Sequence, residues 1–117
     1  AIYNVEKFIS WMEKVRKRGL HKKTYILPGV LVNKSLKSIE MTKLVAGMDV
    51  PDNLVERMRE AENVQDEGVN IAVELINEIR KVDGIAGIHI MAVGWESIVP
   101  TIVEKCGLLP RPVPEDL

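Results

Sequence analysis

The fold is decided by the stretch Tyr25-Ile26-Leu27-Pro28-Gly29-Val30-Leu31-Val32, which is apolar at consecutive positions and therefore on both faces of an extended chain. A second run of the same kind spans residues 85–93. Strands that are apolar on both faces are typical of parallel sheets covered on both sides. Because proline has no backbone N–H, we expect regular pairing of the first strand to end at Pro28 and the chain to leave the sheet at Pro28-Gly29.

Apolar residues at helical spacing surround and separate the two runs, and most of these segments end at a glycine. The predicted helices run from Asn4 to Gly19, from Asn33 or Ser35 to Gly47, from Pro51 through Met58, from Asp66 to Gly84, and from Trp95 to Gly107. The residues expected to face the core include Leu36, Ile39, Leu44 and Val45 of the second helix and Val69, Ala72, Val73, Ile76 and Ile79 of the fourth. Pro100 is expected within the first turn of the last helix.

Alternation of helices with buried strands predicts right-handed β-α-β crossovers and a parallel sheet. Such a sheet belongs either to a doubly wound fold or to part of a (β/α)8 barrel. No glycine-rich dinucleotide fingerprint follows either strand, and Ala1-Ile2-Tyr3 has the character of a strand entered midway. Both observations favour an α/β fold of the barrel type. The chain would form only part of the barrel, because so few strands cannot close one.

The composition is that of an ordinary globular domain, with 117 residues, 46% hydrophobic and 28% charged, and a formal net charge of −1. This near-neutral balance and the 4% aromatic content argue against a nucleic-acid partner. Neither apolar run reaches the ~20 residues of a membrane helix, and no signal peptide opens the sequence, so we expect no membrane partner. With the lone Cys106 and no Cys/His cluster for zinc, the composition suits a reducing cytoplasm.

Single residues that invite a chemical role have ordinary structural explanations. Asp66 and Glu67 lie where acidic residues complement a helix dipole. His89 lies within the second apolar run and is predicted to be a hydrogen-bonded core residue, and Cys106 is predicted to be a small core residue. The basic residues Lys14, Arg16, Lys17, Arg18, Lys22 and Lys23 are expected to form a solvated helix end, with a phosphate or polyglutamate site as the second interpretation. Spacing alone therefore identifies no function.

Several segments, taken together and in order, resemble one known family. They are Pro28-Gly29-Val30-Leu31, the helix after Val50-Pro51, Gly68-Val69-Asn70-Ile71-Ala72, Gly87-Ile88-His89-Ile90, and Gly107-Leu108-Leu109-Pro110-Arg111-Pro112. The combination resembles the C-terminal part of the methylenetetrahydrofolate reductase family across nearly the whole chain. The resemblance implies an α/β fold, the C-terminal portion of a (β/α)8 TIM barrel. Residues 1–3 would end strand 6, residues 23–31 would form strand 7 and residues 85–93 strand 8, with residues 1–109 in the barrel and 110–117 as a Pro-rich tail.

The resemblance implies a cytoplasmic enzyme of one-carbon metabolism that reduces 5,10-methylenetetrahydrofolate to 5-methyltetrahydrofolate. It also implies FAD in the full-length protein, NAD(P)H or another electron donor, and a homo-oligomer or a partner subunit. The family's catalytic carboxylates and nearly all its FAD contacts lie on the first strands of the barrel. None of them would fall in this chain, so the chain alone is expected to carry no catalytic, flavin-binding or metal-binding residue and to be inactive.

The positions that the resemblance carries over are on the folate side of the site. They are Ser38 and Thr42 after the seventh strand, and Met91 and Val93 at the carboxyl end of the eighth, where barrel active sites lie. Many family members have a proline, an aromatic residue, a tyrosine and an asparagine where this chain has Val32, Thr42, Met91 and Gly94. These departures suggest a divergent branch, such as the reductases that work with a partner subunit.

Two other hypotheses compete with this one. The chain would be part of another barrel enzyme if a phosphate site followed its last two strands, but only the lone Gly94 follows the second. Alternatively, the chain would be a non-enzymatic interaction module whose exposed strand edges pair with another chain.

Overall fold

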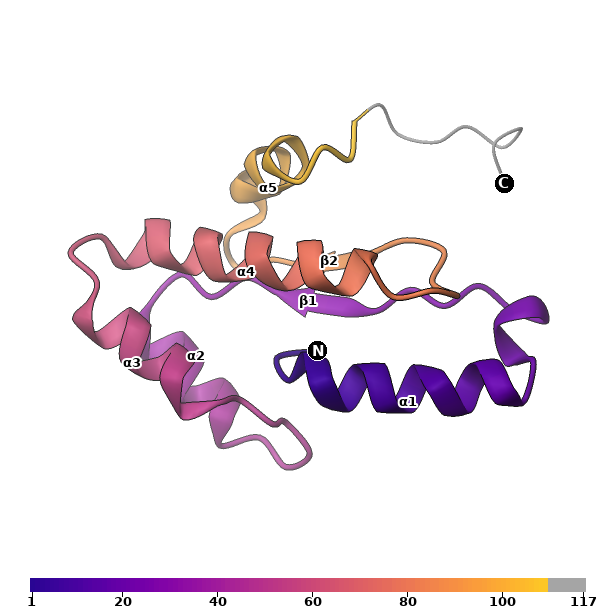
Figure 1. The fold of residues 1–117 in the computed structure, drawn as a ribbon. Coiled ribbons are helices and arrows are strands. Elements are labelled where there is room, and N and C mark those ends of the chain that lie inside the picture. The colour runs from indigo at the N-terminus through magenta and orange to yellow at the C-terminus, as the bar shows by residue number, and fades with distance from the viewer. Residues whose placement is uncertain (110–117) are drawn as a thin grey trace.

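The computed structural model of the protein describes residues 1–109, so the predicted Pro-rich tail at 110–117 lies outside the described residues. Figure 1 shows the helices α1 (Val5–Lys17), α2 (Leu36–Lys43), α3 (Asp52–Glu60), α4 (Val64–Arg80) and α5 (Val99–Lys105), and the strands β1 (Gly29–Leu31) and β2 (His89–Met91). Single turns of 3-10 helix, η1 (Leu20–Lys22) and η2 (Glu96–Ile98), follow α1 and precede α5. The order of elements is therefore the predicted alternation of helices and strands.

The two strands pair directly and in parallel, as predicted, with Val30 opposite Ile90. Pairing continues beyond the short ladder, because the Ala86 amide donates to the Ile26 carbonyl at 2.9 Å and the Val32 amide to the Met91 carbonyl at 2.9 Å. On the other side of β1, the Ile2 amide donates to the Gly29 carbonyl at 2.8 Å. The first residues of the chain thus lie beside β1, although they form no assigned strand.

The prediction that pairing ends at Pro28 is wrong, because the regular ladder begins immediately after it. The Pro28 carbonyl accepts from the His89 amide at 2.9 Å, so Pro28 still joins the two strands. Its missing N–H leaves a gap in the ladder before Gly29, and residues 25–27 therefore lie alongside 85–87 without forming a regular strand. The exit from the sheet comes instead after Val32.

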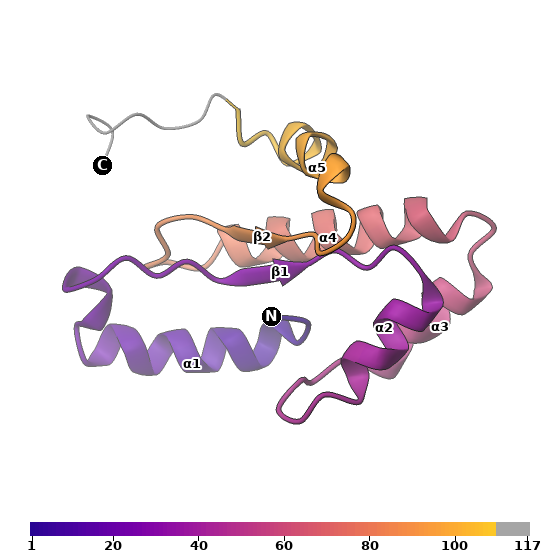
Figure 2. The same cartoon turned by 180° about the vertical axis from the view of Figure 1, so that it is seen from behind.

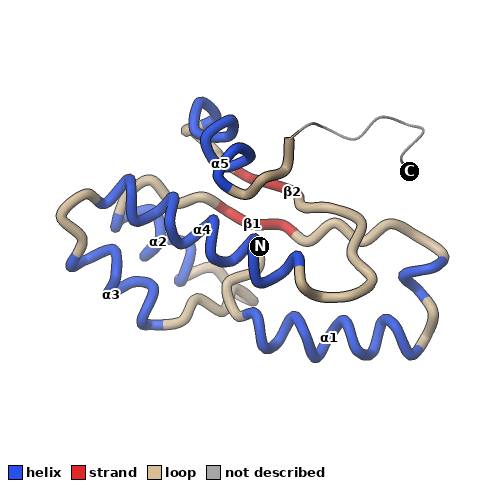
Figure 3. Tube along the Cα trace, turned by 45° about the horizontal axis from the view of Figure 1, so that its top comes forward, coloured by secondary structure: helices blue, strands red, loops and turns tan. Residues whose placement is uncertain are grey.

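The helices of residues 1–109 cover only one face of the sheet. In Figure 1 α4 lies in front of the strands and α1 runs below them, and Figure 2, seen from behind, shows β1 and β2 with no helix in front of them. Figure 3 shows the strands side by side, with α2 and α3 together at one end and α5 beyond β2. Cover on a single face is what part of a barrel requires, whereas a doubly wound sheet carries helices on both faces.

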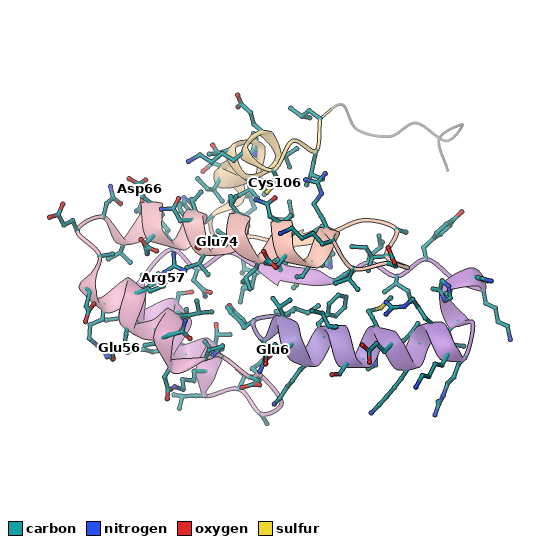
Figure 4. The ribbon with its side chains drawn as sticks, viewed as in Figure 1. Glu6, Glu56, Arg57, Asp66, Glu74 and Cys106 are labelled. Atoms are coloured by element: carbon teal, nitrogen blue, oxygen red, sulfur yellow. The ribbon has the colours of Figure 1, made fainter. Side chains whose placement is uncertain are left out.

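The core lies between the covered face of the sheet and the helices. Its fully buried side chains are Met12, Val30, Ile39, Met58, Ile76, Ile79 and Ile102. Leu54, Val55 and Met58 of α3 are buried, and so are the predicted core residues of α4, except that Val73 is only half-buried. Cys106 is buried at the end of α5, as predicted (Figure 4), and burial raises the pKa of its thiol.

Three predictions of burial are wrong. Helix α2 ends at Lys43, so Leu44 and Val45 lie in the following turn and are exposed, Leu44 by 85%. His89 is exposed rather than a core residue, because its side chain belongs to the uncovered face of the sheet. A run of apolar residues shows that a strand is suited to burial, but it does not show which segment covers each face.

Local signals account for most helix ends. The Asn4, Ser35 and Asn63 side chains accept the amides of Lys7, Ser38 and Asp66 and so cap α1, α2 and α4. Pro51 precedes the first residue of α3 by one position instead of beginning it. Pro100 lies in the first turn of α5, as predicted.

The acidic residues at the start of α4 have structural roles. Glu67 pairs with Arg57 of α3 at 2.5 Å, and Arg57 also pairs with Glu74 at 2.7 Å (Figure 4). Asp66 is exposed in the first turn of α4, where a negative charge complements the helix dipole. The exposed basic residues in the last turn of α1 and just after it match the predicted solvated helix end, apart from Arg16, which is half-buried and donates to the Asp83 carbonyl at 2.8 Å.

Candidate functional site

Alternate residues of the two strands form the uncovered face of the sheet. A Cβ placed on Gly29 would lie 2.7 Å from Met91 Cε, so these two positions share that face. Because side chains alternate along a strand, Leu31 belongs to the same face, whereas Val93 lies in the turn that follows β2. Val93 is 86% exposed, and Met91 is half-buried beside Gly29. Apart from the exposed His89, the two strands therefore present an apolar surface that no described helix covers.

A groove of about 450 Å³ lies where this face meets α2. Its walls are formed by Leu31, Val32 and Val93 from the sheet side, and by Ser35, Lys37, Ser38 and Met41 from the helix side. The groove is at the carboxyl end of β1 and β2, where barrel enzymes hold their substrates. Of the predicted site residues it brings Ser38 and Val93 together, while Met91 and Thr42 do not line it.

Thr42 lies behind the groove, in a polar cluster centred on Asn33. The Asn33 amide donates to Ser38 Oγ at 2.9 Å and to Thr42 Oγ1 at 3.4 Å, and its carbonyl oxygen accepts from the Tyr3 hydroxyl at 2.5 Å. Asn33 is only 3% exposed. Both the NH2 group and the oxygen of this buried side-chain amide are hydrogen-bonded. Such a network holds the Asn33 side chain in one position.

Asn33 and Tyr3 were not predicted as site residues. The available signal was the position of Asn33, a polar residue immediately after a buried strand and so at the carboxyl end of the sheet. Tyr3 gave no such signal, because its partner Asn33 is thirty positions away along the chain.

The groove can bind and orient a ligand. Its apolar residues can pack against a flat ring, while Lys37 and Ser38 offer a positive charge and a hydroxyl. Among the described residues that line it, none carries a carboxylate, an imidazole or a thiol. The chemistry of this groove, as far as residues 1–109 form it, is therefore recognition and not proton transfer.

A larger depression of about 740 Å³ lies beside the amino end of β1. It is bounded by Trp11 of α1, by the first residues of the chain and by residues 25–28. It lies away from the carboxyl ends of the strands and contains none of the predicted site residues, so we do not assign the site there.

Within residues 1–109, no three His, Cys, Asp or Glu side chains stand together as a metal ion would require. No helix in the same part of the chain is long and apolar enough to cross a membrane.

Raising the pH is expected to destabilise the protein through Tyr3. Burial raises the pKa of the Tyr3 hydroxyl to about 12, against the opposing effect of the Thr42 and Asn33 side chains. Between about pH 10 and 12 the unfolded state loses this proton while the folded state keeps it. The free energy of unfolding therefore falls by about 1.4 kcal/mol per pH unit in that window, and Tyr3 has no such effect below it.

Urea unfolding across this pH range, compared between the protein and Tyr3→Phe, isolates the effect of Tyr3. We expect the stability advantage of the parent over Tyr3→Phe to shrink as the pH rises. A difference that stays constant up to about pH 12 would show that the Tyr3 hydroxyl is not held in its protonated form.

Comparisons with known proteins agree with the resemblance found in the sequence. The model of one protein family, described as methylenetetrahydrofolate reductase, matches residues 1–107. A curated relative, "Methylenetetrahydrofolate reductase 1" of Schizosaccharomyces pombe (strain 972 / ATCC 24843), is 31% identical over 111 residues. The alignment covers 92% of this chain but 18% of the relative, so the chain spans less than a fifth of that protein's length.

Proposed function

Because this chain belongs to the methylenetetrahydrofolate reductase family, we propose that it is the C-terminal part of the barrel of a flavin-dependent reductase. The proposed reaction is the reduction of 5,10-methylenetetrahydrofolate to 5-methyltetrahydrofolate, with NAD(P)H or another electron donor. In this proposal β1 and β2 are the seventh and eighth strands, and Ile2 lies at the end of the sixth. Family membership also favours this function over that of an unrelated phosphate-binding barrel enzyme.

One observation supports the proposal more than any other. The sheet has one face packed on helices and one apolar face without a described helix, and the groove opens on that second face at the carboxyl ends of the strands. In a barrel this face would look toward the interior, and the carboxyl ends would form the mouth. A folate would enter at that mouth and meet the predicted residues Ser38 and Val93.

The predicted residues are given different roles in this proposal. Met91 and Val93 would pack against a flat ring of the folate, since both are apolar, Met91 belongs to the uncovered face and Val93 lines the groove. Ser38 would meet a polar group of the substrate in the groove, and Thr42 would support it from behind through Asn33.

The residues of this chain do not fit a whole FAD. The groove is about 450 Å³ in volume, and Lys37 is the one cation among its described lining residues. A dinucleotide brings two ring systems and a diphosphate, which calls for more room and more hydrogen-bond donors. We therefore assign no step of the flavin chemistry to this chain and limit its role to the folate side of the site.

The proposed contact at the uncovered face is tested by lysine substitutions in the longer reductase polypeptide that contains this chain. Met91→Lys and Val93→Lys each place a charge where an apolar ring would pack. We expect at least one of them to raise the Michaelis constant for methylenetetrahydrofolate by about tenfold or more, the equivalent of about 1.4 kcal/mol of lost binding.

Val45→Lys is the matched control, because Val45 is also exposed and apolar but lies in the turn after α2 and outside the groove. Thermal melting and flavin content should match the parent in all three variants. If Met91→Lys and Val93→Lys both keep the parent's Michaelis constant while folded and loaded with flavin, neither residue contacts the folate.

A further inference from the structure

The protons of the Asn33 cluster can be assigned from its partners. The Thr42 hydroxyl donates its only proton to the Ser38 carbonyl at 2.9 Å. Thr42 can therefore only accept from Asn33, which requires that the amide nitrogen of Asn33, and not its oxygen, face α2. The oxygen then faces Tyr3, whose hydroxyl donates to it at 2.5 Å. Each polar group of the cluster has a complementary partner in this arrangement.

The same arrangement determines what Ser38 can do. Its Oγ accepts from the Asn33 amide nitrogen at 2.9 Å, so the hydroxyl proton of Ser38 must point elsewhere. No acceptor for that proton occurs among the hydrogen bonds of the described residues. Ser38 also lines the groove, opposite Val93. The Ser38 hydroxyl therefore accepts a hydrogen bond on its buried side and can donate its proton toward the groove.

We propose that Asn33 is a positioning residue that turns the Ser38 hydroxyl into a hydrogen-bond donor toward the groove, where it meets an acceptor oxygen of the substrate. This inference rests on the proposed function and concerns the same groove. Tyr3 keeps the Asn33 amide in one orientation, because its hydroxyl, buried and protonated, gives the amide oxygen a permanent donor. Tyr3 thus positions Asn33, and Asn33 positions Ser38. Of these three residues, only Ser38 contacts the substrate.

Substitutions of Ser38 in the longer reductase test the last step. Ser38→Ala removes the donor, so we expect the Michaelis constant for methylenetetrahydrofolate to rise about tenfold with little change in kcat. Ser38→Thr keeps the hydroxyl and is expected to stay within about threefold of the parent. Equal Michaelis constants for the parent and Ser38→Ala would overturn the proposal.

Asn33→Asp tests the positioning step. A carboxylate can only accept, so the Ser38 proton would turn inward to it and the groove would lose its donor. We expect a rise in the Michaelis constant like that of Ser38→Ala, and no further rise when the two substitutions are combined, because Asn33 acts through Ser38. Asn53→Asp, at an exposed position of α3, is the matched control and should leave the constant unchanged.

The outcomes separate this inference from the proposed function. A parent polypeptide without methylenetetrahydrofolate reductase activity would overturn the function and the inference together. An active parent in which the effects of Asn33→Asp and Ser38→Ala add fully would keep the function and overturn the inference. If Asn33→Asp does not fold, as judged by thermal melting, the comparison of Ser38→Ala with Ser38→Thr decides alone.

Discussion

Replacing Gly68 with alanine is expected to lower the free energy of unfolding by about 3 kcal/mol or more. Gly68 lies on the buried side of α4, where the helix crosses the chain that leaves β1. A Cβ at this position would lie 2.0 Å from the Asn33 carbonyl oxygen and 3.2 Å from its carbonyl carbon. Both are backbone atoms, so the helix and the strand must move apart to make room.

The direction of the change in stability distinguishes the close contact at Gly68 from an effect of helix propensity. In the interior of a helix, replacing glycine with alanine ordinarily stabilises by about 1 kcal/mol, so propensity alone predicts the opposite result. Urea unfolding of Gly68→Ala beside Gln65→Ala, an exposed position on the same helix, would separate the two. A Gly68→Ala variant as stable as the parent would mean that α4 does not approach Asn33 as closely as described.

The position of Gly68 also links the fold to the site. Gly68 begins the segment Gly68-Val69-Asn70-Ile71-Ala72, one of those on which the resemblance to the reductase family depends. The structure gives a physical reason for a glycine here, since the backbone that it approaches belongs to Asn33. Because Asn33 holds Ser38 and Thr42, the contact between α4 and Asn33 helps to fix one wall of the groove.

The existence of each helix and the parallel pairing were predictable because their causes are local or repeated, whereas some limits were not, since α2 ends at Lys43 and not at Gly47. Asn4 and Ser35 are N-caps whose side chains bond within the next few residues, and the apolar stripe of α4 repeats over several turns. The parallel pairing followed from two apolar runs joined by helices.

Other features depend on segments that the pattern of one strand does not reveal. His89 was predicted to be buried because its neighbours are apolar, but no described helix covers its face of the sheet. The regular ladder lies after Pro28 and not before it, because the residues of β2 stand opposite Gly29, Val30 and Leu31. The sequence of β1 alone does not reveal this register. In the site, Ser38 and Val93 were predicted from the resemblance and share a groove, whereas Tyr3 was missed because its role depends on a distant partner.

The second large effect is an all-or-none difference in flavin binding. We expect the 117-residue chain alone to bind no FAD and to show no reductase activity, because its groove does not fit the dinucleotide. The longer reductase polypeptide that contains the chain is expected to bind FAD in a one-to-one ratio. The absorbance spectrum of each purified protein measures this directly, since bound oxidised flavin is yellow. The chain must be shown to be folded by circular dichroism before its spectrum is interpreted.

The central claim is that this chain supplies the folate side of a flavin-dependent methylenetetrahydrofolate reductase. Its most direct test is to reduce the flavin of the longer polypeptide anaerobically and add methylenetetrahydrofolate, with the chain alone carried through the same steps. We expect the flavin of the longer polypeptide to be reoxidised as methyltetrahydrofolate forms, and the folded chain alone to hold no flavin. Stoichiometric flavin on the chain alone, or a reduced flavin in the longer polypeptide that methylenetetrahydrofolate does not reoxidise, would contradict it.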